Sequence, residues 1–128
     1  MDDLAALATE QFCYLTTNGR TTGQPHMIEI WFALDGTTLY LLSGGGDRSD
    51  WVRNLRADPA VTVGIGRRDA PARPGRARVV SDPDEDARAR DLVAGKYQPG
   101  YGGDLSGWRR MALPVAVDLE PRASAAPS

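Results

Sequence analysis

The sequence predicts a mainly β protein of the α+β class: an antiparallel barrel, closed or nearly closed, with short flanking helices. Three observations predict this fold. Six short segments are rich in β-branched, aromatic or alternating apolar residues, and turn residues separate them. Two helical stretches interrupt these segments without the regular strand–helix alternation of a doubly wound sheet. The 128 residues suit one domain, 1–128, in which an antiparallel barrel buries that many strands.

The first half of the chain is expected to hold one short helix and three strands. Asn18-Gly19 and Asp35-Gly36 are tight-turn pairs, and the second predicts a hairpin. Between these turns, Ile28 and Ile30 alternate with Met27 and other residues, which is typical of a half-buried strand. The expected elements are a helix over 2–8 and strands over 12–17, 25–34 and 37–42.

The second half is expected to hold two helices and three strands. Pro59 ends the first helix, and Pro83 with its acidic neighbours starts the second. Two stretches rich in glycine or proline, 67–76 and 98–107, are predicted to be loops. The expected elements are helices over 50–57 and 83–97 and strands over 60–66, 77–80 and 113–119, with a frayed, disordered tail from 122 to 128.

Composition excludes several classes of function. The chain has 15 basic and 17 acidic residues, which disfavours nucleic acid as a partner because phosphate backbones attract a clear positive excess. Its single cysteine, Cys13, forms no internal disulfide and no metal site. The acidic start and the lack of a run of about 20 apolar residues indicate a cytoplasmic protein without a membrane segment.

A glycine-rich turn between a strand and a helix is the first candidate ligand site. The segment 43–49 reads Ser-Gly-Gly-Gly-Asp-Arg-Ser. Its glycines would let backbone N–H groups approach an anion, and the helix start adds a positive dipole end. Arg48 and the hydroxyls of Ser43 and Ser49 would complement a phosphate. A plain strand-to-helix turn explains these residues equally well.

Other candidate ligand contacts are a histidine, an arginine and two tyrosines. His26 opens the strand over 25–34, where it is either a polar contact to a ring or phosphate at the barrel mouth or a hydrogen-bonding residue of the barrel end. Arg53 follows the glycine turn and is the next candidate after Arg48. Tyr97 precedes the glycine-rich stretch 98–107 and Tyr101 lies within it, from where they would form a lid over a planar ring together with Trp108.

Four stretches together resemble a known family. They are 19–26 (Gly-Arg-Thr-Thr-Gly-Gln-Pro-His), Trp31-Phe32, 39–45 (Leu-Tyr-Leu-Leu-Ser-Gly-Gly), and 51–59 (Trp-Val-Arg-Asn-Leu-Arg-Ala-Asp-Pro) followed by Val61 and Val63. They resemble the deazaflavin-dependent nitroreductase family, which belongs to the pyridoxamine-phosphate-oxidase-like split-barrel superfamily. The resemblance covers about residues 12–66.

The resemblance implies a six-stranded antiparallel split β-barrel and a homodimer with its cofactor at the subunit interface. It also implies hydride transfer from the reduced deazaflavin coenzyme F420 to a small-molecule acceptor: a quinone, a nitro compound or an enone. Carried onto this sequence, it makes nine positions cofactor-binding: His26, Ile28, Ser43, Gly44, Gly45, Arg48, Ser49, Trp51 and Asn54.

Two alternatives to an F420-dependent reductase remain at this point. His26, Met27 and Glu29 stand where many relatives carry arginine or lysine and a proline, which keeps FMN open as the cofactor. A carrier that binds flavin, F420 or haem without turnover is the other alternative. Because the cofactor performs hydride chemistry itself, we expect no essential acid–base residue, and Tyr97 or Tyr101 is at most a proton or hydrogen-bond donor to the acceptor oxygen.

Overall fold

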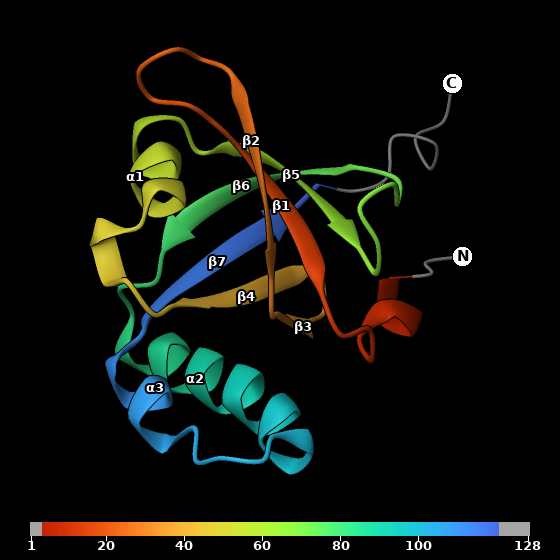
Figure 1. Ribbon diagram of the computed structural model, residues 1–128, viewed down its shortest axis with the longest axis vertical. Helices are drawn as coiled ribbons and strands as arrows, with labels where there is room; N and C mark the ends of the chain where they lie inside the picture. Colours follow the sequence, from red (N-terminus) through yellow and green to blue (C-terminus); the bar gives the residue numbers. More distant parts are fainter. Residues whose placement is uncertain (1–3, 121–128) are drawn as a thin grey trace.

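The computed structural model describes residues 4–120, and these form one curled antiparallel sheet with three α-helices around it (Figure 1). The sheet has seven strands in the order β2-β1-β5-β6-β7-β4-β3. The strands are β1 Cys13–Asn18, β2 Pro25–Ile30, β3 Ala33–Asp35, β4 Thr38–Ser43, β5 Ala60–Ile65, β6 Arg73–Val79 and β7 Leu113–Leu119. The helices are α1 Asp50–Ala57, α2 Pro83–Tyr97 and α3 Ser106–Met111, and 3-10 turns cover Leu4–Leu7, Gly46–Arg48 and Gln98–Gly100.

The chain connection between the two edge strands forces the sheet to curl. β2 and β3 lie at opposite edges of the sheet, yet only two residues separate Ile30 from Ala33. Seven flat strands would hold those edges about 29 Å apart, whereas three residues of chain reach about 11 Å. The edges therefore meet, and the sheet is a barrel closed by the chain rather than by a complete hydrogen-bond ladder. This confirms the expected mainly β, split-barrel fold.

The sheet has one strand more than the six that the sequence predicts, because the strand expected over 25–34 is broken at Trp31 and Phe32. The Phe32 backbone bonds to α2 instead of to a neighbouring strand. Its N–H donates to the Tyr97 hydroxyl at 3.0 Å, and its carbonyl accepts from Lys96 Nζ at 3.0 Å. The break turns the chain from one edge of the sheet to the other.

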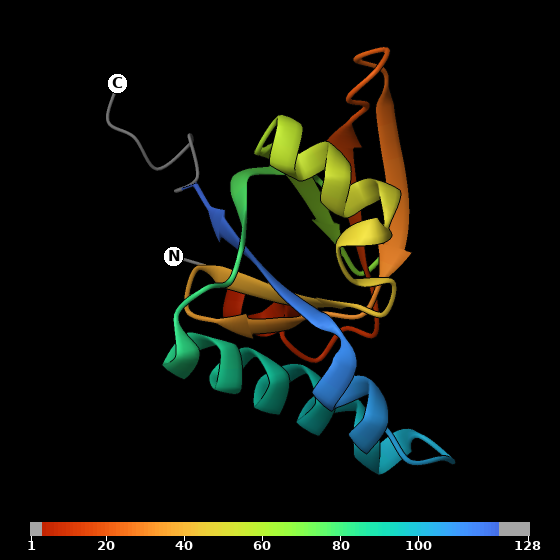
Figure 2. The same cartoon turned by 90° about the vertical axis from the view of Figure 1, so that its left-hand side faces the viewer.

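Two hydrophobic clusters stabilise the fold. The inner one fills the barrel with the inward side chains of the strands, such as Leu15, Leu41 and Val115, and is completed by Val52 and Leu55 of α1. The outer one lies between α2 and the outer face of β4 and β7, with α2 packed beneath these strands (Figure 2). The two helices therefore cover different parts of the sheet, and α1 lies beside the β1–β2 end.

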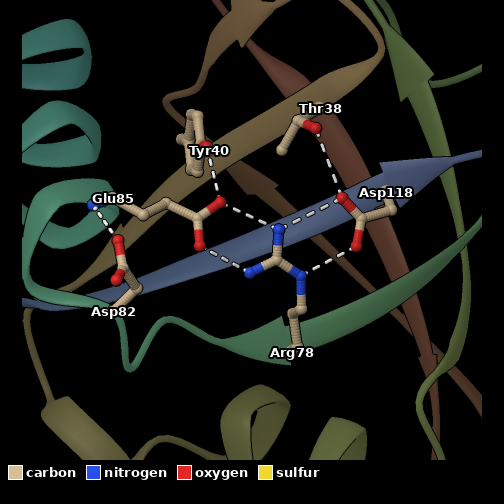
Figure 3. Close-up of polar contacts among 6 residues, drawn as sticks. All are labelled: Thr38, Tyr40, Arg78, Asp82, Glu85 and Asp118. Atoms are coloured by element: carbon tan, nitrogen blue, oxygen red, sulfur yellow. Dashed lines mark hydrogen bonds and ion pairs between the residues drawn. The ribbon is translucent and has the colours of Figure 1, made fainter.

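A charged cluster ties α2 to the outer face of β6 and β7 (Figure 3). Arg78 donates to both carboxylate oxygens of Glu85, at 2.6 and 2.8 Å, and to both oxygens of Asp118, at 3.2 and 2.8 Å. The Tyr40 hydroxyl donates to Glu85 at 2.7 Å, and Thr38 donates to Asp118 at 3.2 Å. Bidentate arginine–carboxylate pairs of this kind fix orientation as well as distance.

Two predicted loops are shorter in the structure than the sequence suggests. The stretch 67–76 was expected to be a loop, but β6 already begins at Arg73. A Cβ on Gly75 would lie 2.7 Å from Val117 Cγ1, so this glycine serves close strand packing rather than a turn. The stretch 98–107 holds a 3-10 turn and the start of α3. Arg90 of α2 binds the carbonyls of Arg109 and Arg110 and so stabilises this short helix.

The remaining elements agree with the sequence within a few residues. Gly36, with φ +62°, forms the expected hairpin turn between β3 and β4. The expected first helix is a 3-10 turn over Leu4–Leu7, and the tail 122–128 lies outside the described residues. Within residues 4–120, no helix is long and apolar enough to cross a membrane.

Candidate functional site

A cleft of about 630 Å³ lies between the β1–β2 loop, strand β2 and helix α1. Four of the residues predicted to bind cofactor line it: His26, Ile28, Trp51 and Asn54. In β2 the side chains of His26 and Ile28 lie on one face, since they pair with Thr17 and Leu15 of β1. Arg20, Thr21 and Thr22 of the β1–β2 loop line the same cleft. Guanidinium, imidazole and hydroxyl groups therefore converge there.

Asn54 connects the helix to the loop and fixes the shape of the cleft. Its side chain is 4 % exposed. The amide Nδ2 donates to Thr17 Oγ1 at 3.1 Å, and Oδ1 accepts from the backbone N–H of Arg20 at 3.2 Å and from Arg20 Nη1 at 2.8 Å. The oxygen and the nitrogen of this buried amide thus both hold β1, the β1–β2 loop and α1 together.

Arg20 is the cation that the cleft holds in place. Its Nη2 also donates to Asp50 Oδ1 at 3.1 Å, and Nη1 lies 3.5 Å from the Asp50 carbonyl. A guanidinium has five N–H donors, so the Nε–H and one Nη2–H remain without a partner among the described residues. An oriented arginine with unused donors, beside threonine hydroxyls, is a suitable binding group for a phosphate.

The glycine turn does not line this cleft. Ser43 Oγ donates to the carbonyl of Gly46 at 2.9 Å and lies 2.9 Å from Ser49 Oγ, which therefore donates to it. A Cβ on Gly45 would lie 2.5 Å from Ser49 Oγ, so the turn is closely packed around these two hydroxyls. The hydroxyls that the sequence assigns to a phosphate thus bond to each other and shape the turn.

Two arginines near the turn remain available for a ligand. Arg48 lies in the 3-10 turn that precedes α1, and Arg53 lies on α1; both side chains are exposed. Neither guanidinium has a hydrogen bond or ion pair with another residue in the range 4–120. They place positive charge near the cleft without belonging to its wall.

A second pocket, of about 500 Å³, lies at the other end of β2, against α3. Its walls are aromatic. Trp31 meets Tyr101 and Trp108 nearly at right angles, with ring centroids 6.0 and 5.7 Å apart. Glu29 and Asp104 add carboxylates to the lining. Planar apolar walls with a few polar groups are typical of a site for a ring-shaped ligand.

The two tyrosines proposed as proton donors have different surroundings. The Tyr97 hydroxyl is buried, accepts from Phe32 N–H and lies 2.8 Å from the Gln11 carbonyl. Burial raises the Tyr97 pKa to about 12. Tyr101 is 47 % exposed and lines the aromatic pocket. Tyr97 thus shapes the pocket from behind, and Tyr101 faces it.

The cleft and the pocket lie next to each other along the same two segments of the chain. Residues 25–28 of β2 line the cleft, and residues 29–31 line the pocket. On the other side, Leu42 and Trp108 line the pocket, and Asp50 and Trp51 line the cleft. The glycine turn joins Leu42 to Asp50, and a Cβ on Gly44 would lie 3.6 Å from Trp108 Nε1. Donors that suit a phosphate and flat aromatic walls therefore lie along the same two segments.

Sequence reasoning did not identify several of these lining residues. Arg20 and the two threonines after it follow a turn signal, Asn18-Gly19, in the same way as Arg48 and Ser49 follow the glycine turn. A turn signal followed by a basic residue and hydroxyls therefore occurs twice in the sequence, and only the glycine turn led to a predicted phosphate site. The carboxylates of Glu29 and Asp104 carry no local signal, because they belong to a strand and a loop that only the fold brings together.

Comparisons with known proteins identify the family of the chain and support its fold. A family model described as F420H(2)-dependent quinone reductase matches residues 5–120. A putative pyridoxamine 5'-phosphate oxidase from Listeria innocua is 25% identical, with a TM-score of 0.67, over 92% of this chain and 90% of that one. A structure described as an F420 reductase is 22% identical, with a TM-score of 0.66, over 94% and 96%. One described as a domain-swapped dimer is 20% identical, with a TM-score of 0.65, over 85% and 79%.

Proposed function

The chain belongs to the F420H(2)-dependent quinone reductase family, and we propose that it transfers a hydride from reduced coenzyme F420 to a small organic acceptor. A quinone, a nitro compound or an enone is the acceptor class that we expect. The observation that carries this proposal is the pair of hollows along β2, one with oriented phosphate donors and one with aromatic walls.

The residues present suit such a cofactor. Arg20, Thr21, Thr22 and His26 supply donors for its phosphate, with Arg48 and Arg53 as further positive charge nearby. In the adjoining pocket, Trp31 and Trp108 supply flat apolar surface for the ring of the acceptor that the coenzyme would reduce. The glycine turn lets the backbone pass close beside the pocket without side chains at Gly44 and Gly45.

In this proposal the protein binds and orients the coenzyme and the acceptor and excludes water from them. The bound reduced coenzyme supplies the hydride. The hydride brings two electrons and one proton to the acceptor, and one further proton completes reduction of a quinone to a hydroquinone. Asn54 holds Arg20 for the phosphate. Trp31, stacked on Tyr97, gives the pocket a fixed wall. Tyr101 is the better placed tyrosine to donate a hydrogen bond or proton to the acceptor oxygen.

We also propose that the enzyme works as a homodimer in the cytoplasm, with the coenzyme between subunits, as the resemblance of the sequence implies. A protein of the same fold is described as a domain-swapped dimer, which supports association of two copies. Light scattering of the purified chain tests the dimer. A monomeric mass in the presence of saturating F420 would contradict it.

A parallel fluorescence titration of the ligand-free protein with F420 and with FMN tests the cofactor. We expect saturable F420 binding and much weaker FMN binding. Anaerobic oxidation of reduced F420 by menadione, followed by absorbance, then tests turnover. The opposite cofactor preference would make the protein an FMN enzyme of the same fold. Tight F420 binding with no turnover of any acceptor would make it a carrier, and binding of neither would refute the proposal.

A further inference from the structure

The aromatic pocket beside α3 has a charge that the proposed hydride chemistry does not use. Its lining includes Glu29, Asp104, Trp31, Tyr101 and Trp108. Two of these residues are acidic. No lysine, arginine or histidine is among the lining residues, all of which lie in the described part of the chain. The cleft at the other end of β2 differs, since Arg20 and His26 line it with Asp50.

The carboxylates are held where they are by neighbouring groups. Glu29 Oε2 accepts from the Tyr14 hydroxyl at 2.7 Å. The Asp104 oxygens accept from the backbone N–H and the hydroxyl of Ser106, both at 2.9 Å. These hydrogen bonds keep the Asp104 pKa below its usual value, and Arg110 nearby adds to this. Both side chains are exposed, so they remain open to a ligand as well.

The aromatic rings favour the same kind of ligand as the carboxylates do. The face of an indole or phenol ring carries negative potential, which attracts a cation that lies within about 6 Å of the ring centre. Trp31 presents one face to Tyr97, which stacks on it at 4.2 Å with 4° between the planes. Tyr101 and Trp108 stand across from Trp31 at 85° and 87°. Trp31 and two rings nearly perpendicular to it thus line the pocket together with two carboxylates.

We propose that this pocket binds planar aromatic cations, and, resting on the proposed function, that such cations are preferred over anions of the same shape as hydride acceptors. A flat ring lies against Trp31 or Trp108, and its positive charge faces Glu29 and Asp104. An anion of the same size meets two carboxylates and electron-rich rings, with no basic side chain in the wall to offset them.

The first test measures binding without any cofactor. The purified protein is titrated with 1-methylquinolinium and with 1-naphthoate, which share a two-ring shape and differ in charge, and tryptophan quenching is followed. We expect the cation to bind about tenfold more tightly or better, because cation–π and carboxylate contacts act together. Equal affinities, or tighter binding of 1-naphthoate, would overturn the proposal.

Variants then locate the selectivity. Glu29→Gln with Asp104→Asn keeps one acceptor oxygen in each side chain, for the Tyr14 hydroxyl and for the Ser106 N–H, and we expect it to reduce the cation preference about tenfold. Glu29→Lys is expected to reverse the preference towards 1-naphthoate. Glu120→Gln, an exposed carboxylate outside the pocket, is the control and should leave the preference unchanged. An unchanged preference in the double variant, shown to be folded by circular dichroism, would refute the assignment.

Turnover distinguishes this inference from the proposed function. Naphthoquinones that carry either a trimethylammonium or a sulfonate group are compared as acceptors for reduced F420. We expect a lower KM for the cationic quinone, and a loss of that difference in the double variant. Turnover of both quinones with equal KM would overturn the inference and leave the proposed function in place. Cation-selective binding without turnover of any acceptor would refute the function and leave the pocket's selectivity in place.

Discussion

The indole ring of Trp31 stacks on the phenol ring of Tyr97, with 4.2 Å between the centroids and 4° between the planes. Trp31 comes from the break between β2 and β3, and Tyr97 is the last residue of α2. The stack therefore joins the outer helix to the point where the barrel edges meet. It also fixes the orientation of the ring that forms one wall of the aromatic pocket.

The first prediction separates the roles of the two tyrosines. Tyr97→Phe keeps the stack but removes the hydroxyl that binds Phe32 N–H and lies 2.8 Å from the Gln11 carbonyl. Leaving the buried Phe32 N–H without a partner should lower the free energy of unfolding by about 1–3 kcal/mol in urea titrations. Turnover per folded molecule should stay within about twofold of the wild type, because the lost contacts serve the fold rather than proton transfer.

Tyr101→Phe is the matched control for that prediction. Because this tyrosine is exposed, the stability of the variant should stay within about 0.5 kcal/mol of the wild type. If its hydroxyl assists the acceptor, kcat should fall about tenfold or more. Unimpaired turnover in Tyr101→Phe would remove it from that role, and a large loss in folded Tyr97→Phe would transfer the role to Tyr97.

The second prediction concerns Asn54, whose amide joins Thr17, Arg20 and helix α1. Asn54→Ala leaves the Thr17 hydroxyl and the Arg20 donors without their partner, which should cost about 1–3 kcal/mol of stability. Affinity for F420 should also fall about three- to tenfold, because Arg20 is no longer held in the cleft. Arg56→Ala, an exposed position on the same helix, is the control. Unchanged F420 affinity in folded Asn54→Ala would show that Arg20 does not contact the coenzyme.

The fold could be predicted from the sequence largely because its signals are local. Turn pairs such as Asp35-Gly36, and the proline and acids at the start of α2, act within a few residues. The break at Phe32 could not be predicted, because the side chains that hydrogen-bond to its backbone belong to residues 64 and 65 positions further along the chain. The alternation of apolar residues predicts a strand that continues to residue 34.

For the site, residue type predicted a ligand-binding region but not the partners of each side chain. His26, Ile28, Trp51 and Asn54 do share a cleft. Ser43 and Ser49 suit a phosphate and suit each other equally well, and only the fold shows that they bond to each other. The sequence does not mark Arg20 as a ligand contact, because a basic residue in a turn is usually solvated and its hydrogen bonds to Asn54 are long-range.

The third prediction concerns acid stability and the cluster around Arg78. Hydrogen bonds from Arg78 and Tyr40 lower the pKa of Glu85 to about 2 from its usual value of 4.5. Because the folded-state pKa is the lower one, the ionised carboxylate stabilises the fold above pH 4.5. This contribution is lost progressively as the pH falls from 4.5 towards 2.

Glu85→Gln should therefore lower stability at neutral pH and make the loss of stability below pH 4.5 shallower than in the wild type. The Asp118 pKa is lowered as well, by the same arginine, so part of the acid sensitivity should remain. Thermal unfolding from pH 7 to pH 2 measures both effects. Asp69→Asn, which removes a highly exposed ion pair with Arg67, should change neither. An identical pH profile for wild type and Glu85→Gln would contradict the prediction.

The fourth prediction tests how closely the glycine turn is packed. A Cβ on Gly45 would lie 2.5 Å from Ser49 Oγ, so Gly45→Ala must displace the Ser49 side chain and break its hydrogen bond to Ser43. We expect a loss of about 1–3 kcal/mol in stability, as for other over-packed sites. Because the turn connects the wall of the pocket to α1, F420 affinity should fall with it.

Ser49→Ala tests whether the contact with Ser49 causes the loss of stability in Gly45→Ala. Ser49 makes no side-chain cap hydrogen bond to α1, so its replacement by alanine should cost little beyond the contact with Ser43. In the Ser49→Ala background the clashing oxygen is gone, and Gly45→Ala should cost clearly less than it does alone. The difference is the coupling energy of a double-mutant cycle. Strictly additive losses would show that the alanine is resisted by the backbone of the turn and not by Ser49.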